Sequence, residues 1–429
     1  MSRQAETTPP AWAASTTPAT SFVADGPANR RLDTTRFPAR ARRAFALLGA
    51  AREGRLAIAF PDGQQAILGG GEQQADIALR NWKPVDAALE RGDIGFAETY
   101  IDGDWTTGDP VRLLRFFLRN RKAADRLIFG SLAGRLAYRL RHLARRNSRR
   151  GAPRNIRSHY DLGNEFYAIW LDASMSYSSA LFGDAAVDAG PARPDALRAA
   201  QMAKYARVID ELKLAPASRI LEVGCGWGGF AEVAARSGHL VTGLTLSPAQ
   251  LEFARRRMAR QGLPHELVLR DYRDERGRYD GIASIEMFEA VGEKYWPQYF
   301  AMLARCLKPG GRACIQTITI DEALFERYRR GTDFIQQYVF PGGMLPSPGA
   351  FERAAERGGL KVVERFRFGA SYARTLATWR ATFSDRAASV RALGFDERFL
   401  RTWNFYLGYC EAAFAEHNTD VFQFTLAHR

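Results

Sequence analysis

A cluster of glycines near the middle of the 429-residue chain is the first feature that could do chemistry. The stretch 224–229 reads GCGWGG and directly follows the apolar run 219–223. Glycines lack side chains, so they let a backbone approach a ligand closely and open the helix that follows. We therefore predict a nucleotide-like ligand on this loop, held by Gly224, Gly226 and Gly228.

The acidic residues around this loop separate two cofactors. A dinucleotide site expects an Asp or Glu at the end of the second strand, but here that strand ends in 244–247, LTLS, which contains no acid. Glu222 instead stands two residues before the first glycine, in the E-x-G-x-G-x-G order of S-adenosylmethionine methyltransferases. A carboxylate there suits the amino group and the sulfonium charge of that cofactor. The pattern favours S-adenosylmethionine over NAD.

A second acidic position supports the same cofactor. Asp271 and Tyr272 lie in LRDYRD, just past the third expected strand. Such enzymes commonly place there the acid that hydrogen-bonds the adenine amino group. Taken alone, Asp271 could equally be a turn-forming aspartate, but the order of all these features favours a cofactor contact.

The elements that must position these residues alternate between strands and helices. Apolar runs at 219–223, 239–246, 266–270, 279–286, 312–320 and 421–428 predict strands. Helices are expected to begin near Gly228, Ser247 and Tyr295. This alternation predicts an α/β fold with a doubly wound, Rossmann-like sheet, whose ligands bind at the carboxyl ends of the strands. Glu289 follows the fourth of these strands and would lie at that edge.

The rest of the chain divides by composition. Residues 1–35 are rich in Thr, Pro, Ala and Ser and predict a disordered tail, while 36–122 mix strand-like and helical runs typical of a small α+β domain. A basic amphipathic helical connector is expected at 123–154, and a methyltransferase domain at 155–429. Within it, 321–348 interrupt the alternation, either as a lid over a hydrophobic pocket or as a plain helix and loop.

Positive charge is concentrated in one segment. Residues 112–154 hold fourteen arginines and lysines against one aspartate, whereas the whole chain has a net charge of +14. Leucines recur there at helical spacing, with several arginines on another side of the expected helix. The segment predicts attachment to anionic lipid headgroups or to nucleic acid; a solvated helix whose leucines cover the protein is the plainer interpretation.

The composition also bears on compartment and metals. The four cysteines form no metal-binding pattern or disulfide framework, and no run of eighteen apolar residues or secretory signal occurs. We expect a cytoplasmic protein without a structural metal, associated peripherally with the inner face of the membrane.

A long stretch upstream of the glycine loop resembles a known family. Residues 155–167 (NIRSHYDLGNEFY), 170–172 (WLD) and 175–180 (MSYSSA) closely resemble the cyclopropane fatty acid and mycolic acid cyclopropane synthases. Further similar segments are GCGWGG, 243–247, 287–292, 340–343 and 369–372. The resemblance extends from about Phe37 to the C-terminus. It implies a class I methyltransferase acting on unsaturated acyl chains of membrane phospholipids.

The resemblance also assigns roles to individual residues. Its cofactor contacts fall on Tyr177, Ser178, Gly224, Gly226, Thr245, Gln250 and Asp271, and we add Leu246 and Ser247 from the same strand end. Glu289 and Tyr372 correspond to two ligands of a bicarbonate ion that acts as the base. The chain departs from the pattern at Ser179, where the family has Cys, and at Gln316, where it has His; Ile318 remains at the backbone-donor position.

The implied chemistry demands a particular environment. Methyl transfer to an alkene leaves a carbocation, which needs a dry aromatic pocket and a well-placed base. Candidate rings are those of Tyr167, Tyr177, Trp296, Phe340 and Tyr372, and Glu289 would either accept the proton or hold the base. Because two ligands of the base are changed, both a cyclopropane and a methyl-branched product remain open.

Three other functions are compatible with parts of the sequence. An amine N-methyltransferase could use the same scaffold without a bicarbonate base, and a non-catalytic lipid-binding homologue would explain Ser179 and Gln316. Nucleic-acid binding is suggested only by the charge, and we expect none because no recognised binding motif is present. The oligomeric state is left open, with a homodimer as one option.

Overall fold

The computed structural model describes residues 33–124, 162–183 and 189–429. A small N-terminal lobe contains a four-stranded sheet in the order β2-β1-β3-β4. β1 and β3 are parallel, whereas the β1–β2 and β3–β4 pairs are antiparallel. Its elements are α1 (Ala39–Leu48), β1 (Gly54–Ala59), β2 (Gln65–Gly70), β3 (Gln74–Leu79), α2 (Lys83–Ile101), β4 (Trp105–Thr106) and α3 (Pro110–Arg119).

Alternating burial explains why this sheet forms. Leu56 and Ile58 of β1 and Ile77 of β3 are buried, while neighbouring positions are less covered. This period of two lets one face of the sheet pack against helices. In α2, Gly92 has φ 65° and ψ −142°, which interrupts the helix with a kink just before Asp93.

The large lobe contains a seven-stranded sheet in the order β10-β11-β9-β8-β5-β6-β7. The pairs β9–β8, β8–β5, β5–β6 and β6–β7 are parallel, and β11 runs antiparallel to both of its neighbours. The doubly wound α/β fold predicted from the sequence is confirmed. Its strands are β5 (Arg219–Val223), β6 (Leu240–Thr245), β7 (Glu266–Leu269), β8 (Tyr279–Ile285), β9 (Leu307–Ile320), β10 (Leu360–Arg367) and β11 (Thr419–His428).

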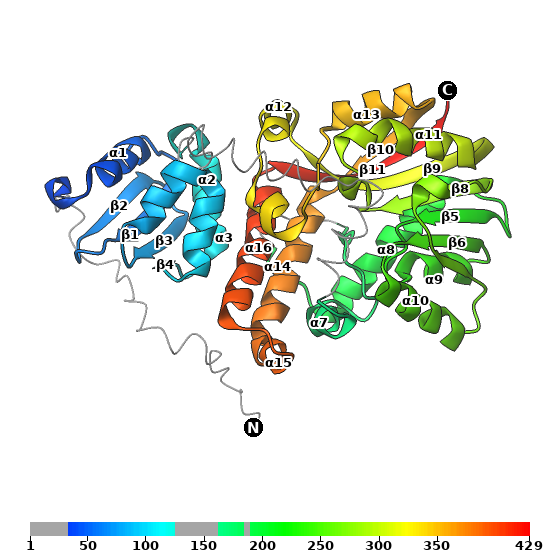
Figure 1. The fold of residues 1–429 in the computed structure, drawn as a ribbon, viewed down its shortest axis with the longest axis horizontal. Coiled ribbons are helices and arrows are strands. Elements are labelled where there is room, and N and C mark those ends of the chain that lie inside the picture. Colours follow the sequence, from blue (N-terminus) through cyan, green and yellow to red (C-terminus); the bar gives the residue numbers. More distant parts are fainter. Residues whose placement is uncertain (1–32, 125–161, 184–188) are drawn as a thin grey trace.

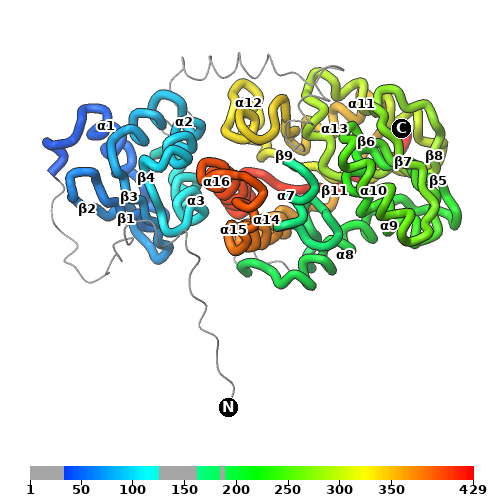
Figure 2. Tube along the Cα trace, turned by 60° about the horizontal axis from the view of Figure 1, so that its bottom comes forward, coloured from blue at the N-terminus to red at the C-terminus, as the bar shows by residue number. Residues whose placement is uncertain are grey.

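Helices flank this sheet and connect it to the N-terminal lobe (Figure 1). Two long C-terminal helices, α14 and α16, stand between the lobes in both views (Figure 2), and α16 packs against α3. The helices of the large lobe are α7 (Asn164–Trp170), α8 (Pro194–Leu212), α9 (Gly229–Arg236), α10 (Pro248–Arg260), α11 (Trp296–Cys306), α12 (Glu322–Arg330), α13 (Pro348–Arg357), α14 (Gly369–Asp385), α15 (Ala387–Ala392) and α16 (Glu397–Ala415).

The basic segment 112–154 is described only as far as residue 124. Within that part, Arg115 and Arg119 form ion pairs with Glu416 at 2.6 and 2.7 Å, and their side chains are only 18% and 19% exposed. These two arginines hold the lobes together rather than facing a membrane. The remainder of the expected basic connector lies outside the described residues. In the part of the chain that the structure covers, no helix is long and apolar enough to cross a bilayer.

Candidate active site

The glycine loop joins the carboxyl end of β5 to α9. Gly224, Gly226 and Gly228 have φ values of +88°, +50° and +80°, a region that favours glycine. A Cβ at Gly224 would lie 2.8 Å from Met287 Cγ, whereas one at Gly226 would meet no described atom within 4 Å. The open side of Gly226 is therefore the place where a ligand can approach the backbone.

Glu222 supplies the charge that a cationic ligand needs beside this loop. Its side chain is buried, and its Oε2 has no hydrogen-bond partner among the described residues. Burial raises the pKa of Glu222 to about 8, although a backbone hydrogen bond involving Ala231 and the charge of Lys204 lower it. A buried carboxylate oxygen without a partner is unfavourable. The amino group of S-adenosylmethionine would satisfy it, so these residues fit that cofactor.

The end of β6 forms the opposite edge of the loop. Thr245 Oγ1 donates to Gln250 Oε1 at 3.3 Å and accepts from the Ser247 N–H at 3.2 Å. Ser247 caps α10 by accepting from the Gln250 N–H at 3.3 Å, and Leu246 between them is half-buried. The predicted cofactor contacts of this turn therefore lie together in a hydrogen-bonded helix cap. The cap contains no acidic residue.

Asp271 is held differently from the other predicted cofactor contacts. It begins the short helix Tyr272–Asp274, and Arg273 donates to its two carboxylate oxygens at 2.8 and 2.5 Å. Its carboxylate therefore has a partner within the chain, which adenine would have to share. The adenine contact at Asp271 and the role of Tyr272 stay predictions.

A buried lysine that we did not predict lies beneath the segment 177–178. Lys204 Nζ donates to Ser178 Oγ at 2.6 Å and to Gln201 Oε1 at 2.5 Å. Burial lowers the pKa of Lys204 to about 7, while Glu286 and other nearby carboxylates act against this shift. The available signal was its position in α8, because Lys204 lies on the same buried face as Leu197, Gln201 and Val208.

Glu286 is the second residue that sequence reasoning missed. It follows β8 directly, and its carboxylate Oε1 accepts from the Ser179 N–H at 2.8 Å and from Gln316 Nε2 at 2.7 Å. The Tyr372 side chain also lies close enough to interact with this carboxylate. Burial raises the pKa of Glu286, and these hydrogen bonds and Lys204 lower it. A glutamate ending an apolar strand at the ligand-binding edge was the signal available in the sequence.

Glu289 lies close to Glu286 but has different partners. Its Oε1 accepts from Thr317 Oγ1 at 3.0 Å and from the Ile318 N–H. Its Oε2 is buried and has no partner in the described parts of the chain. Burial, followed by the charge of Glu286, raises the pKa of Glu289 to about 8. Two half-buried carboxylates thus lie side by side at the carboxyl edge of the sheet.

Aromatic rings gather near Glu286. The Tyr177 hydroxyl lies 2.7 Å from that of Tyr406, and the Tyr177 ring centroid lies 5.3 Å from Tyr167 and 6.5 Å from Phe340. Tyr372 belongs to the same apolar cluster. Four of the five predicted rings therefore come together.

The fifth candidate ring lies elsewhere. Trp296 stacks on Phe288 at 5.4 Å in a separate core cluster beneath α11. Its position at the start of that helix buries it against the other face of the β8 end. The assignment of Trp296 to the aromatic pocket was therefore wrong.

The residues at the base position do not fit a bicarbonate ion. Ser179, Gln316 and Tyr372 were assigned to that ion, but the Ser179 N–H and Gln316 Nε2 donate to the Glu286 carboxylate, and Tyr372 lies beside it. The remaining donor, the Ile318 N–H, binds Glu289. A free anion would have to displace a side-chain carboxylate of the same charge from its donors. The fold brings the predicted ligands together, but they surround the Glu286 carboxylate.

Comparisons with known proteins agree with this geometry. The model of the family described as mycolic acid cyclopropane synthetase matches residues 147–424. A tuberculostearic acid methyltransferase from Mycobacterium tuberculosis is 40% identical over 340 residues, covering 78% of this chain and 79% of that protein. The cyclopropane-fatty-acyl-phospholipid synthase of Escherichia coli K12 is 33% identical, with 82% and 88% covered.

A solved structure is similar in the same region. The mycolic acid cyclopropane synthase CmaA1, complexed with SAH and CTAB, aligns with a TM-score of 0.58 and 29% identity. The alignment covers 64% of this chain and 97% of that one.

Proposed function

We propose that this protein, which belongs to the mycolic acid cyclopropane synthetase family of S-adenosylmethionine-dependent methyltransferases, methylates the double bond of an unsaturated acyl chain in a membrane phospholipid. Transfer of a methyl or methylene group to lipids is common to its relatives. The choice of an alkene as acceptor rests on one observation. Two half-buried carboxylates, Glu286 and Glu289, lie side by side at the carboxyl edge of the sheet, and Tyr372 of the aromatic cluster lies beside the first.

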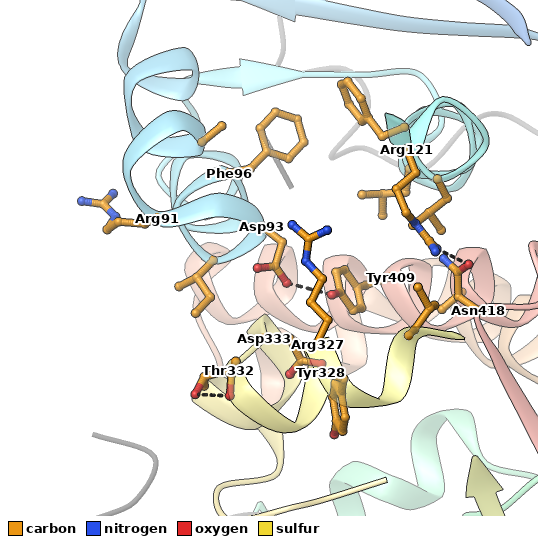
Figure 3. A pocket seen from close by; sticks show the side chains of 18 of the residues that line it. Arg91, Asp93, Phe96, Arg121, Arg327, Tyr328, Thr332, Asp333, Tyr409 and Asn418 are labelled. Atoms are coloured by element: carbon orange, nitrogen blue, oxygen red, sulfur yellow. Dashed lines mark hydrogen bonds between the residues drawn. The ribbon is translucent and has the colours of Figure 1, made fainter. Parts of the chain in front are cut away.

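The substrate class is supported by a large cavity between the lobes. It has a volume of about 950 Å³ and is lined mostly by apolar side chains of β1, β3, α2, α3 and α12. Four arginines from both lobes also line it, namely Arg91, Arg121, Arg327 and Arg330 (Figure 3 labels the first three). Apolar walls suit acyl chains, and guanidinium groups suit a phosphate. A phospholipid combines both properties.

This cavity lies beside the acidic site. Leu345 lines the cavity, while the N–H of its neighbour Met344 donates to the Glu289 backbone oxygen at 2.9 Å. Tyr328 also lines the cavity, and its hydroxyl accepts from the Leu345 N–H at 3.3 Å. One layer of the segment 321–348 thus separates the two regions. Movement of that segment would let an acyl chain reach the carboxylates.

The reaction divides into tasks for the chain. When bound, S-adenosylmethionine supplies an electrophilic methyl group. The glycine loop and Glu222 hold it beside the sheet edge, and the buried rings around Tyr177 exclude water. Positive charge left on the acyl chain after methyl transfer is attracted by the faces of those rings. A carboxylate at the strand ends then accepts the proton that restores neutrality.

The product depends on which proton leaves. Direct loss from the new methyl group closes a cyclopropane ring. Loss from a neighbouring chain carbon, or from the methyl group after a 1,2-hydride shift, instead leaves a methyl-branched or methylene-bearing alkene. Both outcomes add one CH₂ to the substrate, so they are isomers. Relatives of both kinds occur, one named for a methyltransferase and one for a cyclopropane synthase.

The experiment is expression in a host that lacks such enzymes, followed by analysis of its phospholipids. We expect unsaturated acyl chains to gain one CH₂ while still esterified in phospholipid, as read by mass spectrometry. Nuclear magnetic resonance then distinguishes a ring from an alkene. Unchanged lipids, together with cofactor consumption on small amines, would instead favour an amine N-methyltransferase.

A further inference from the structure

The backbone at Glu286 has an unusual conformation. Its φ is +50°, in the left-handed region, although the residue is not a glycine. Such strain persists only where surrounding structure holds it, and it concentrates at functional sites. Here β8 pairs with β9 up to Ile285 and Gln316, and the Glu286 N–H then donates to the Gln316 backbone oxygen at 2.8 Å. The turn directs the glutamate side chain back over the sheet edge.

A chain of hydrogen bonds fixes the direction of the donors around this carboxylate. Arg207 Nη1 donates to Gln423 Oε1 at 2.8 Å, and Gln423 Nε2 donates to Gln316 Oε1 at 3.0 Å. Gln316 Nε2 is thereby left to donate to Glu286 at 2.7 Å.

The start of this relay makes its polarity unambiguous. A guanidinium can only donate, so neither amide can be reversed without breaking a bond. Gln423 and Gln316 face each other across β11 and β9. Helix α8 and two neighbouring strands, β11 and β9, therefore direct the Gln316 amide N–H toward Glu286, where an acceptor is required.

We propose that the Glu286 carboxylate replaces the bicarbonate ion as the base of this enzyme. This inference rests on the proposed function and adds the group that takes the proton. The carboxylate accepts hydrogen bonds from two of the groups that the family resemblance assigns to the ion, Ser179 and Gln316, and a third, Tyr372, lies beside it.

The step balances without any further reactant. The alkene electron pair forms the bond to the methyl carbon, and the carbon–sulfur bond breaks toward sulfur. A C–H pair of the methylated chain then forms the ring or the new double bond. Its proton passes to Glu286, which becomes a neutral carboxylic acid.

Glu289 has a different place in this scheme. One of its oxygens is held by Thr317 and the Ile318 N–H, and Arg207 does not reach it through the relay. Of these two acids, only Glu286 accepts a hydrogen bond from the Gln316 amide. Glu289 therefore holds the adjoining backbone and borders the base, while Glu286 receives the directed donors.

Two substitutions of Glu286 separate the role of its charge from that of its volume. Glu286→Gln keeps the size but removes the basic oxygen. Glu286→Gly is compatible with a φ of +50° and opens space for a small anion. Glu356→Gln, at an exposed position of α13, is a matched control for the loss of one carboxylate. Calorimetric binding of S-adenosylhomocysteine checks that each variant is folded.

Turnover is measured on vesicles of dioleoyl phosphatidylglycerol, with and without added bicarbonate. We expect the wild type to be indifferent to bicarbonate and both Glu286 variants to lose about 100-fold or more. Added bicarbonate should raise the turnover rate of Glu286→Gly about tenfold, because the anion can enter the space left by the side chain and act as the base. It should not change the rate of Glu286→Gln, whose side chain still fills that space. Turnover of Glu286→Gln near the wild-type rate would overturn the inference.

A measurement of bicarbonate binding tests the role of Glu286 independently of the identity of the lipid substrate. Titration with ¹³C-labelled bicarbonate, followed by its resonance, should show binding to Glu286→Gly and none to the wild type. Specific binding to the wild type would overturn the inference even if lipids are methylated. If the wild type leaves lipids unchanged while this binding pattern holds, the proposed function fails and the placement of Glu286 in the anion position is supported.

Discussion

Two pairs of half-buried acids, one in the catalytic sheet and one at the lobe boundary, have donors of contrasting origin. Glu286 and Glu289 take their donors from β9 and from the Ser179 backbone, all within a single sheet domain. Asp93 belongs to the N-terminal lobe, but its donors, the Tyr409 hydroxyl at 2.7 Å and the Phe334 N–H at 3.2 Å, belong to the other lobe. Asp333 faces it across the cavity (Figure 3).

The difference shows that the same physical effect, loss of solvation, acts on two pairs of acids with different roles. Burial and then the charge of Asp333 raise the pKa of Asp93 to about 7, and burial raises that of Asp333 to about 6. Neither acid belongs to the relay that ends on Glu286. Protonation of the first pair should change turnover, whereas protonation of the second should change how the lobes dock. Five predictions test this division, beginning with the largest effect.

Gly226→Val should abolish S-adenosylmethionine binding. A branched side chain at this open position would fill the space through which the cofactor reaches the backbone. Gly262→Val is the matched control, because Gly262 also has a positive φ and an open Cβ direction but lies beyond α10. Isothermal titration calorimetry measures both variants. Unchanged affinity in Gly226→Val would contradict the assignment of the loop.

Glu289→Gln and Tyr372→Phe should each slow turnover by about 100-fold while leaving the cofactor site intact. The first change removes a titratable carboxyl group beside the base, and the second removes a hydroxyl that lies beside Glu286. Steady-state rates with vesicles and calorimetry with S-adenosylhomocysteine are the paired measurements. A variant that keeps the wild-type rate would remove its residue from the proposed machinery.

The double substitution Ser179→Cys/Gln316→His should change the rate or the ratio of the isomeric products. The imidazole of the new histidine would replace the Gln316 amide, which connects Gln423 to Glu286. The position of the Glu286 carboxylate would therefore shift. Product analysis by nuclear magnetic resonance, compared with each single variant, reads the effect. If neither rate nor product changes, these two positions do not control the proton that leaves.

Charge reversal of the basic segment should weaken membrane attachment. Replacing Arg135, Arg139, Arg146 and Arg150 by Glu removes about 1 kcal/mol of surface attraction for each residue near an anionic membrane. These four positions lie outside the described residues, so this prediction comes from the sequence. Co-sedimentation with anionic vesicles measures it, with cofactor affinity as the control. Unaltered sedimentation would assign the segment a solvated role instead.

The smallest effect concerns the acids at the lobe boundary. Because the folded-state pKa of Asp93 is raised above 3.8 to about 7, its neutral form stabilises docking at low pH, and this contribution is lost as the pH rises through 7. Asp333 adds to the loss, while Tyr409 and the cavity arginine Arg327 also face this region. Asp93→Asn should therefore reduce the fall in melting temperature between pH 6 and pH 8, by about 2 °C.

Calorimetry of the wild type and Asp93→Asn across that pH range provides the measurement. Glu90→Gln, one turn earlier on α2 and exposed, is the control. Identical pH profiles for wild type and Asp93→Asn would show that this acid does not govern docking.

Local sequence determined much of this protein. The glycine loop after β5, Glu222 before it and the alternation of strands and helices are short-range patterns, and each was predicted. Such features depend on neighbouring residues, on backbone freedom and on which face of an element is apolar. Even the aromatic rings could be proposed, except that Trp296 packed in a different core.

Tertiary structure alone decided what surrounds the base. Glu286, Ser179, Gln316 and Tyr372 come from four separate segments, and the donors expected to hold bicarbonate meet a side chain already present. The sequence around Lys204 is that of an ordinary helical lysine, and only the folded structure shows that its side chain is buried. Arg115 and Glu416 are 301 residues apart and pair only after the lobes dock. The charge and orientation of a buried group depend on which distant donors reach it, and only the folded chain fixes those neighbours.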